Sequence, residues 1–148
     1  RKKVAYIPQN FNLFEYLTVD QNVKFYSNKT NTLFDDSLYE MLIEKLNLSK
    51  KRDILVSELS IGEQQRVAIA RALVHKPKVL IADEPTGNLD PESTRIILSL
   101  LRDIHDEGTT IILTTHDPEV VNFFQKRVLF LEAGKIKSDK KNATYPEL

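Results

Sequence analysis

The chain has 148 residues, enough for one domain, and 41% of them are hydrophobic, which allows a packed core. Lysine and arginine number 21, as do aspartate and glutamate, so no net charge attracts the chain to nucleic acid or anionic lipid. The sequence has no cysteine, which excludes disulfides and thiolate metal sites. No apolar run approaches the roughly 20 residues that a membrane-spanning helix needs.

The first residue is Arg1, and no signal-peptide pattern follows it. Residues 2–7 already resemble a strand from the middle of a domain. We therefore expect the sequence to be a fragment whose true N-terminus is missing.

A short apolar run over 4–7, ended by Pro8, predicts the first strand. From about residue 13 to 75 the apolar residues recur at helical spacing, which predicts a helical sub-domain. The residues suited to begin its helices are Thr18, Asp35 or Asp36, and Ser60. The first of these helices is expected to run to about Ser27.

Beyond Pro77, which prevents further extension of the third helix, the period changes. Continuous apolar runs predict strands over 79–82, 111–115 and 128–131, the first two buried on both faces. A helical pattern over 92–105 separates the first two, and Gly108 is placed to end that helix. Strands that alternate with helices in this way predict an α/β fold with a parallel sheet.

Polar residues follow three of the predicted strands: Gln9, the pair Asp83 and Glu84, and His116. In open parallel sheets ligands bind at the carboxyl ends of the strands. Each residue alone has an ordinary structural explanation, because an acid can cap the next helix and a single histidine is commonly structural. Three such positions at one edge of a sheet favour a site.

The strand that ends in Asp83 and Glu84 carries the most specific signal. An aspartate at the tip of a buried strand can hold Mg²⁺ on a triphosphate. The adjacent Glu84 is expected on the other face of the strand end, where it can polarise an attacking water. Aliphatic residues followed by one aspartate are common, but the added glutamate and the following Pro-Thr-Gly-Asn-Leu-Asp are not.

Ser60 and Glu63 have the spacing of a capping box, so the simplest interpretation of this segment is a well-capped helix. The same geometry also suits phosphate binding, because a helix N-terminus with a hydroxyl and Gly62 presents free N–H groups and a positive dipole end.

These segments resemble the motifs of ABC transporter nucleotide-binding domains, in the same order along the chain. Gln9 corresponds to the Q-loop, 60–66 to the signature motif, 79–84 to Walker B with the catalytic glutamate, 87–90 to the D-loop and His116 to the switch histidine. The resemblance covers 4–131. The sequences of residues 62–73 (GEQQRVAIARAL) and 82–90 (ADEPTGNLD) are most similar to the branch that serves lipoprotein release, macrolide and peptide export, and cell division. The resemblance implies a P-loop NTPase core with an inserted helical sub-domain, and ATP and Mg²⁺ as ligands.

The resemblance also implies roles for the residues of one half-site. Asp83 would bind Mg²⁺ through water, and Glu84 would be the general base or the orienting group for the attacking water. His116 would contact the γ-phosphate and hold Glu84 and the water in line. Gln9 would touch the metal and the water, and would couple the helical sub-domain to the site.

Other residues would serve the partner subunit in a head-to-tail dimer. Ser60 and Gly62 would bind the γ-phosphate held by that subunit, with Glu63 beside them among the cofactor-binding positions, and Asp90 would cross the interface. The segment 11–16 would lie where a transmembrane permease subunit docks. Its apolar residues, Phe11, Leu13, Phe14 and Tyr16, are equally suited to the core.

Two departures from the family pattern matter. The sequence has no glycine before Gly62, so the phosphate loop (Walker A, G-x-x-x-x-G-K-[ST]) is missing. Ile61 replaces the first of two signature glycines, and a β-branched residue disfavours positive φ. Either this position has an ordinary backbone conformation or binding is weakened, so we expect reduced rather than abolished function at that half-site.

The implied protein is an ATP-hydrolysing subunit that powers transport from the cytoplasmic face of the plasma (inner) membrane. Its expected parts are a core strand with the Q-loop over 1–12, the helical sub-domain over 13–75 and the catalytic core over 76–148. No nucleic acid partner is expected, and the fragment alone should be inactive. Without the missing segment, one face of the sheet should be poorly covered and one edge open.

Two other interpretations remain. One is a soluble ABC-type ATPase of translation or DNA repair. The chromosome and repair relatives insert long coiled coils or zinc modules between the Q-loop and the signature motif, and they are disfavoured because no cysteine and no long heptad pattern lies between Gln9 and Ser60. A non-catalytic dimerisation module is favoured by the missing loop and by Ile61. The intact Asp83, Glu84 and His116 speak against it.

Overall fold

The computed structural model of the chain describes residues 4–25 and 34–145. They fall into two units, one that ends at Thr114 and one that begins at Thr115, and each is described by itself. Over these residues, no helix is both long enough and apolar enough to cross a membrane.

The first unit contains, in chain order, β1 (Val4–Ile7), α1 (Val19–Lys24), α3 (Asp36–Lys45), two 3-10 turns (Ser49–Lys51 and Val56–Glu58), α4 (Ile61–Leu73), β2 (Val79–Asp83), α5 (Pro91–Asp106) and β3 (Thr110–Thr114). The second unit contains α6 (Pro118–Phe124), β4 (Val128–Glu132) and β5 (Lys135–Lys140).

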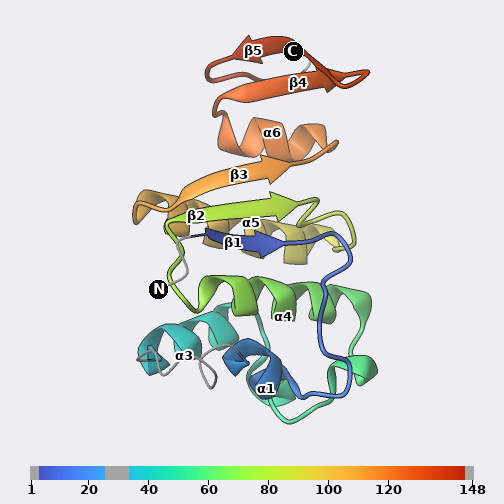
Figure 1. The fold of residues 1–148 in the computed structure, drawn as a ribbon, viewed down its shortest axis with the longest axis vertical. Coiled ribbons are helices and arrows are strands. Elements are labelled where there is room, and N and C mark those ends of the chain that lie inside the picture. Colours follow the sequence, from blue (N-terminus) through green and yellow to red (C-terminus); the bar gives the residue numbers. More distant parts are fainter. Residues whose placement is uncertain (1–3, 26–33, 146–148) are drawn as a thin grey trace. The chain divides into compact units, whose positions relative to one another are not determined.

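The first unit is built on a parallel sheet, as the sequence predicts, and the structure gives the strand order β1-β2-β3. Its register pairs Ile7 with Ala82 and Asp83 with Thr114. The arrows of the three strands point the same way in Figure 1, and α4 and α5 begin on the side where the arrows end. Residues at the carboxyl ends of the strands and at these two helix N-termini therefore face the same side of the unit.

The two faces of this sheet differ in exposure. Ile7, Leu80 and Ala82 are fully buried on one face, where α4 contacts β1 and α5 contacts β3. The other face exposes three apolar side chains, Val4 (52%), Tyr6 (53%) and Ile112 (53%). The prediction that the strand over 111–115 is buried is therefore wrong at Ile112, whereas the strand over 79–82 is half-buried on its second face, at Val79 and Ile81. The expectation of a poorly covered face is confirmed.

The fourth predicted strand, over 128–131, does not join the parallel sheet. It forms β4, which pairs antiparallel with β5. The physical reason is the connection between them, because Ala133 (φ 49°) and Gly134 (φ 75°) are both left-handed, as in the tight turns that join hairpin strands. A two-residue turn of this kind allows only an antiparallel partner.

The predicted helix boundaries agree with the structure where it describes them, except at the end of the first helix. The Thr18 side chain accepts from the backbone N–H of Gln21, and the Asp35 side chain accepts from that of Leu38. Gly108 follows α5 with φ of 102°, the left-handed conformation expected at a helix end. The first helix is shorter than predicted, because α1 ends at Lys24 and Phe25 is its C-cap, whereas the predicted end was near Ser27, which lies outside the described residues.

Candidate functional site

Asp83 is the last residue of β2, at the carboxyl edge of the sheet. Its Oδ1 accepts a hydrogen bond from the Thr114 hydroxyl (2.5 Å), and its Oδ2 accepts one from the Tyr6 hydroxyl (3.4 Å). The strand register explains both contacts. Thr114 is the register partner of Asp83, and Tyr6 is the register partner of Ile81, which lies on the same face of β2 as Asp83. Two hydroxyls orient the carboxylate, which keeps further lone pairs for a cation or its waters.

Glu84 leaves the strand in a left-handed conformation, with φ of 48°. Its N–H donates to the carbonyl of Thr114 (3.1 Å), and its own carbonyl accepts from Gly87 (3.2 Å). The prediction that Glu84 follows the alternation of the strand is wrong, because β2 ends at Asp83 and the chain turns there. Left-handed backbone at a residue other than glycine costs about 1–3 kcal/mol and is common at functional sites.

The Glu84 side chain lies against the loop that follows it. A Cβ placed on Gly87 would be 3.8 Å from the Glu84 Cβ and 4.0 Å from its Oε2. A Cβ at this position would therefore lie in ordinary van der Waals contact with the Glu84 side chain.

Gln9 is exposed in the turn after β1. It follows Ile7 by two residues, as Glu84 follows Ala82, and Ile7 and Ala82 are register partners. The structure thus brings Gln9, Asp83 and Glu84 to the same edge of the sheet, as the sequence predicts.

Ser60 and Glu63 form the predicted capping box at the start of α4. Glu63 Oε2 accepts from the Ser60 backbone N–H (2.9 Å) and hydroxyl (3.0 Å), and Lys51 lies 3.2 Å from its Oε1. These contacts, the backbone bond from Ser60 first, lower the pKa of Glu63. In this structure the Glu63 carboxylate caps its own helix.

Ile61 is the first residue of α4 and is absent from the residues with positive φ. The position therefore has ordinary helical backbone, so the β-branched side chain causes no strain there. The side chain is 60% exposed, which leaves the N-terminus of α4 open to solvent.

The first turns of α4 and α5 lie beside each other. A Cβ on Gly62 would be 3.3 Å from Leu89 Cδ2, and the Arg66 guanidinium donates to the Ser93 hydroxyl (2.9 Å). Asp90 caps α5, and hydrogen bonds from Ser93 lower its pKa. The signature segment and the D-loop of one chain are thus neighbours, a contact that local sequence patterns did not indicate.

His116 lies in the second unit, where it is exposed. It directly precedes Asp117, whose side chain accepts from Glu119 N–H (2.8 Å) and caps α6. The grouping of His116 with Asp83 and Glu84 stays a prediction, because these residues belong to different units.

Metal binding by side chains alone has little support in this structure. Over 4–25 and 34–145 no group of three or more His, Cys, Asp or Glu side chains is arranged to hold a metal ion. Mg²⁺ commonly uses one or two carboxylates together with waters and substrate phosphates. Asp83 fits that limited contribution, since it is an oriented carboxylate at the carboxyl edge of a parallel sheet.

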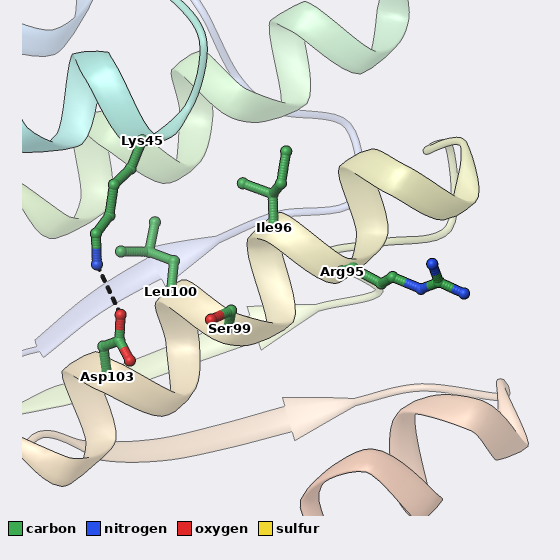
Figure 2. A pocket seen from close by; sticks show the side chains of 6 residues that line it. All are labelled: Lys45, Arg95, Ile96, Ser99, Leu100 and Asp103. Carbon is green, nitrogen blue, oxygen red and sulfur yellow. Dashed lines mark hydrogen bonds and ion pairs between the residues drawn. The ribbon is translucent and has the colours of Figure 1, made fainter.

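A shallow groove of about 340 Å³ lies between α3 and α5, away from these residues. Figure 2 shows Lys45 of α3 paired with Asp103 of α5 (2.7 Å) at one end. Its lining residues are Lys45, Arg95, Ile96, Ser99, Leu100 and Asp103. None of them is a predicted site residue, so the groove gives no support to nucleotide binding there.

Comparison with known proteins decides the family. Residues 1–87, more than half of the chain, match the sequence family described as "ABC transporter". The chain belongs to the ABC transporter family.

Relatives in this family include proteins of cell division and of import. The chain is 42% identical over 149 residues to the cell division ATP-binding protein FtsE of Mycobacterium tuberculosis, and the match covers 98% of this chain and 64% of that protein. It is 45% identical over 139 residues to the methionine import ATP-binding protein MetN of Cupriavidus metallidurans, across 92% of this chain and 40% of that protein.

Solved structures give the same answer for the fold. The dimeric structure of MJ0796, a bacterial ABC transporter cassette, matches with a TM-score of 0.85 at 30% identity. The match covers 97% of this chain and 65% of that chain. MJ0796 in a post-hydrolysis state bound to ADP and Pi matches equally well. The predicted ABC ATPase fold is thereby confirmed, and the chain spans less than two thirds of the FtsE and MJ0796 chains.

Proposed function

We propose that the chain is the larger part of an ATP-binding and ATP-hydrolysing subunit that powers transport across a membrane. The observation that carries the proposal is the arrangement of Asp83 and Glu84 beside Gln9 at the carboxyl edge of the sheet, in a chain of the ABC transporter family. The costly left-handed conformation of Glu84 favours an enzyme over a non-catalytic dimerisation module.

In this proposal, each residue of the edge has one task. Mg²⁺, when bound with ATP, would neutralise charge that develops on the phosphates. Asp83, oriented by Thr114 and Tyr6, would bind the metal through water. Glu84 would accept a proton from the attacking water or orient it, and Gln9 would contact the metal and that water.

The second subunit supplies the rest of the site. Ser60 and Gly62 would contact the γ-phosphate held by a second copy, and Asp90 would cross the interface. His116 would contact the γ-phosphate of its own subunit. The exposed start of α4 supports this role, and MJ0796 is itself a dimer.

The membrane partner would dock next to the Q-loop. Tyr16 is 74% exposed, whereas Phe14 is half-buried and its ring packs on Phe25 with centroids 4.2 Å apart. Among the apolar residues of the 11–16 segment, Tyr16 is therefore the best placed to meet a permease subunit. Phe14 holds the segment in place through its contact with Phe25. This docking would place the protein on the cytoplasmic face of the membrane.

The test is Glu84→Gln in the full-length protein. Loss of a general base commonly lowers turnover by about 100-fold or more, while the isosteric amide leaves nucleotide binding intact. Phosphate release and ATP affinity are measured side by side, with Glu92→Gln on the first turn of α5 as the control. Hydrolysis at the normal rate by Glu84→Gln would show that Glu84 is not the base. Clear turnover by residues 1–148 alone would contradict the need for a phosphate loop.

A further inference from the structure

The loop that carries Gln9 has an unusual backbone. Phe11 (φ 63°) and Asn12 (φ 47°) are two consecutive left-handed residues, and neither is glycine. Asparagine tolerates this conformation, but phenylalanine rarely adopts it. Such a backbone persists only where the surrounding structure holds it in place.

Arg71 of α4 supplies that support. Its Nη2 donates to the carbonyl of Phe11 (2.7 Å), and its Nη1 donates to the carbonyl of Asn12 (2.7 Å). The left-handed turn aims two adjacent carbonyls at one point, and the planar fork of a guanidinium matches such a pair. Hydrogen bonds from a charged donor are stronger than those between neutral groups.

Arg71 connects this loop to the rest of the proposed site through one helix. The first turn of α4 carries Gly62, which lies against Leu89 of the D-loop, and Arg66 donates to Ser93 at the start of α5. The next turns carry Arg71, which contacts the loop after Gln9. A single helix therefore contacts both loops.

We propose that Arg71 of α4 is a positioning residue that sets the conformation of the loop that carries Gln9. Arg71 acts through the carbonyls of Phe11 and Asn12, so its effect on chemistry is indirect. A displacement of α4 carries Arg71 with it, and the Gln9 side chain then moves relative to Asp83. The consequence for metal binding rests on the proposed function, whereas the support of the loop by Arg71 does not.

The first experiment measures amide hydrogen exchange in Arg71→Met, Arg71→Lys and a control, Arg95→Met, which removes an exposed arginine from α5. Loss of two charge-assisted bonds should speed exchange over 9–14 by about tenfold or more in Arg71→Met. Lysine donates from a point charge to one carbonyl at a time, so Arg71→Lys should be intermediate. Ile97 and Leu101, buried in α5, should change by less than about twofold in all variants.

Equal acceleration of the 9–14 amides and of Ile97 and Leu101 would overturn the proposal, because it would show a general loss of stability. Unchanged exchange over 9–14 in Arg71→Met would overturn it as well. If Arg71→Met does not fold, as judged by circular dichroism, Arg71→Lys decides the outcome by the same two criteria.

The second experiment measures ATP hydrolysis by the full-length protein against Mg²⁺ concentration. A misplaced Gln9 should raise the Mg²⁺ concentration at half-maximal rate in Arg71→Lys by about tenfold, the lower range for residues that orient metal ligands. A lower kcat with an unchanged Mg²⁺ requirement would show a structural role only and would overturn the proposal. Absence of hydrolysis by the unmutated protein would instead refute the proposed function, and the exchange experiment would still decide the role of Arg71.

Discussion

At the scale of single residues, the candidate site depends on backbone conformations that most side chains avoid. Glu84, which has a proposed role itself, is left-handed. Phe11 and Asn12, which follow Gln9 within three residues, are left-handed as well. Gly62, in contrast, lies in ordinary helix and leaves room for Leu89. Backbone conformation therefore constrains Glu84, Phe11 and Asn12, whereas the space that Leu89 occupies constrains Gly62.

Glu63 provides a prediction about pH. Its folded-state pKa is below its ordinary value of 4.5, chiefly through the Ser60 backbone bond, so the folded chain binds this proton less readily than the unfolded chain. The stabilisation is therefore present above pH 4.5 and disappears as the pH falls through the lowered pKa. Glu63→Gln should cost roughly 0.5–1 kcal/mol at neutral pH and almost nothing in acid.

Urea unfolding of both forms at neutral pH and again below the lowered pKa checks this. Glu92→Gln, which removes an acid from the first turn of α5, is the matched control. An equal stability difference at both pH values would show that the Glu63 charge contributes nothing.

At the scale of elements, α1 and the segment before it are joined by one buried amide. Asn22 is 0% exposed, and its Oδ1 accepts from the N–H of Phe14 (2.9 Å). Its Nδ2 donates to the carbonyls of Phe14, Leu17 and Thr18. All polar groups of the side chain are satisfied, so Asn22 determines the shape of the segment that we expect to meet the permease.

Asn22→Ala is predicted to destabilise the chain by about 2–3 kcal/mol, because it leaves buried backbone groups without partners. Denaturant unfolding measures the loss, and limited proteolysis should show faster cleavage over 13–18. Glu44→Ala, at an exposed position on α3, is the control and should stay within about 0.5 kcal/mol of the unmutated chain. A change of that small size in Asn22→Ala would contradict the assignment.

At the scale of the whole molecule, the described residues leave much apolar surface in water. Besides the open face of the sheet, the hairpin exposes the cross-strand pair Leu131 (65%) and Ile136 (61%). Proteins that fold alone rarely expose contiguous apolar patches of large area. The β3 strand also has a described partner on one side only, and an unpaired strand edge favours association.

We therefore predict that the purified 148-residue chain binds an apolar dye and sediments above its monomer mass of 17.0 kDa. Ile112→Thr, in the middle of β3 on the open sheet face, should reduce both effects, since it removes apolar surface without changing the strand preference. Ile96→Thr on α5 is the control and should change neither. A monomer that binds no dye would show that this face is covered in solution.

Much of the candidate site was predictable from local patterns. The caps at Thr18, Asp35 and Ser60 were recognised because a cap depends on a few consecutive residues. Asp83 was placed at a strand end because strand length and apolar runs are also local. The left-handed turn at Glu84 is not predictable from the same pattern, because an apolar run shows where a strand ends but not the φ of the residue that follows.

The amino-acid sequence by itself determined the α/β class, the family resemblance and the positions of Gln9, Asp83 and Glu84 along the chain. Only the tertiary structure decided which hydroxyls orient Asp83, that β4 pairs with β5, and that Arg71 supports the Gln9 loop. The physical reason is the sequence separation between the residues that interact. Periodicity and capping arise from neighbours within one or two turns, whereas these contacts join residues far apart in sequence that become partners only when strands and helices have packed.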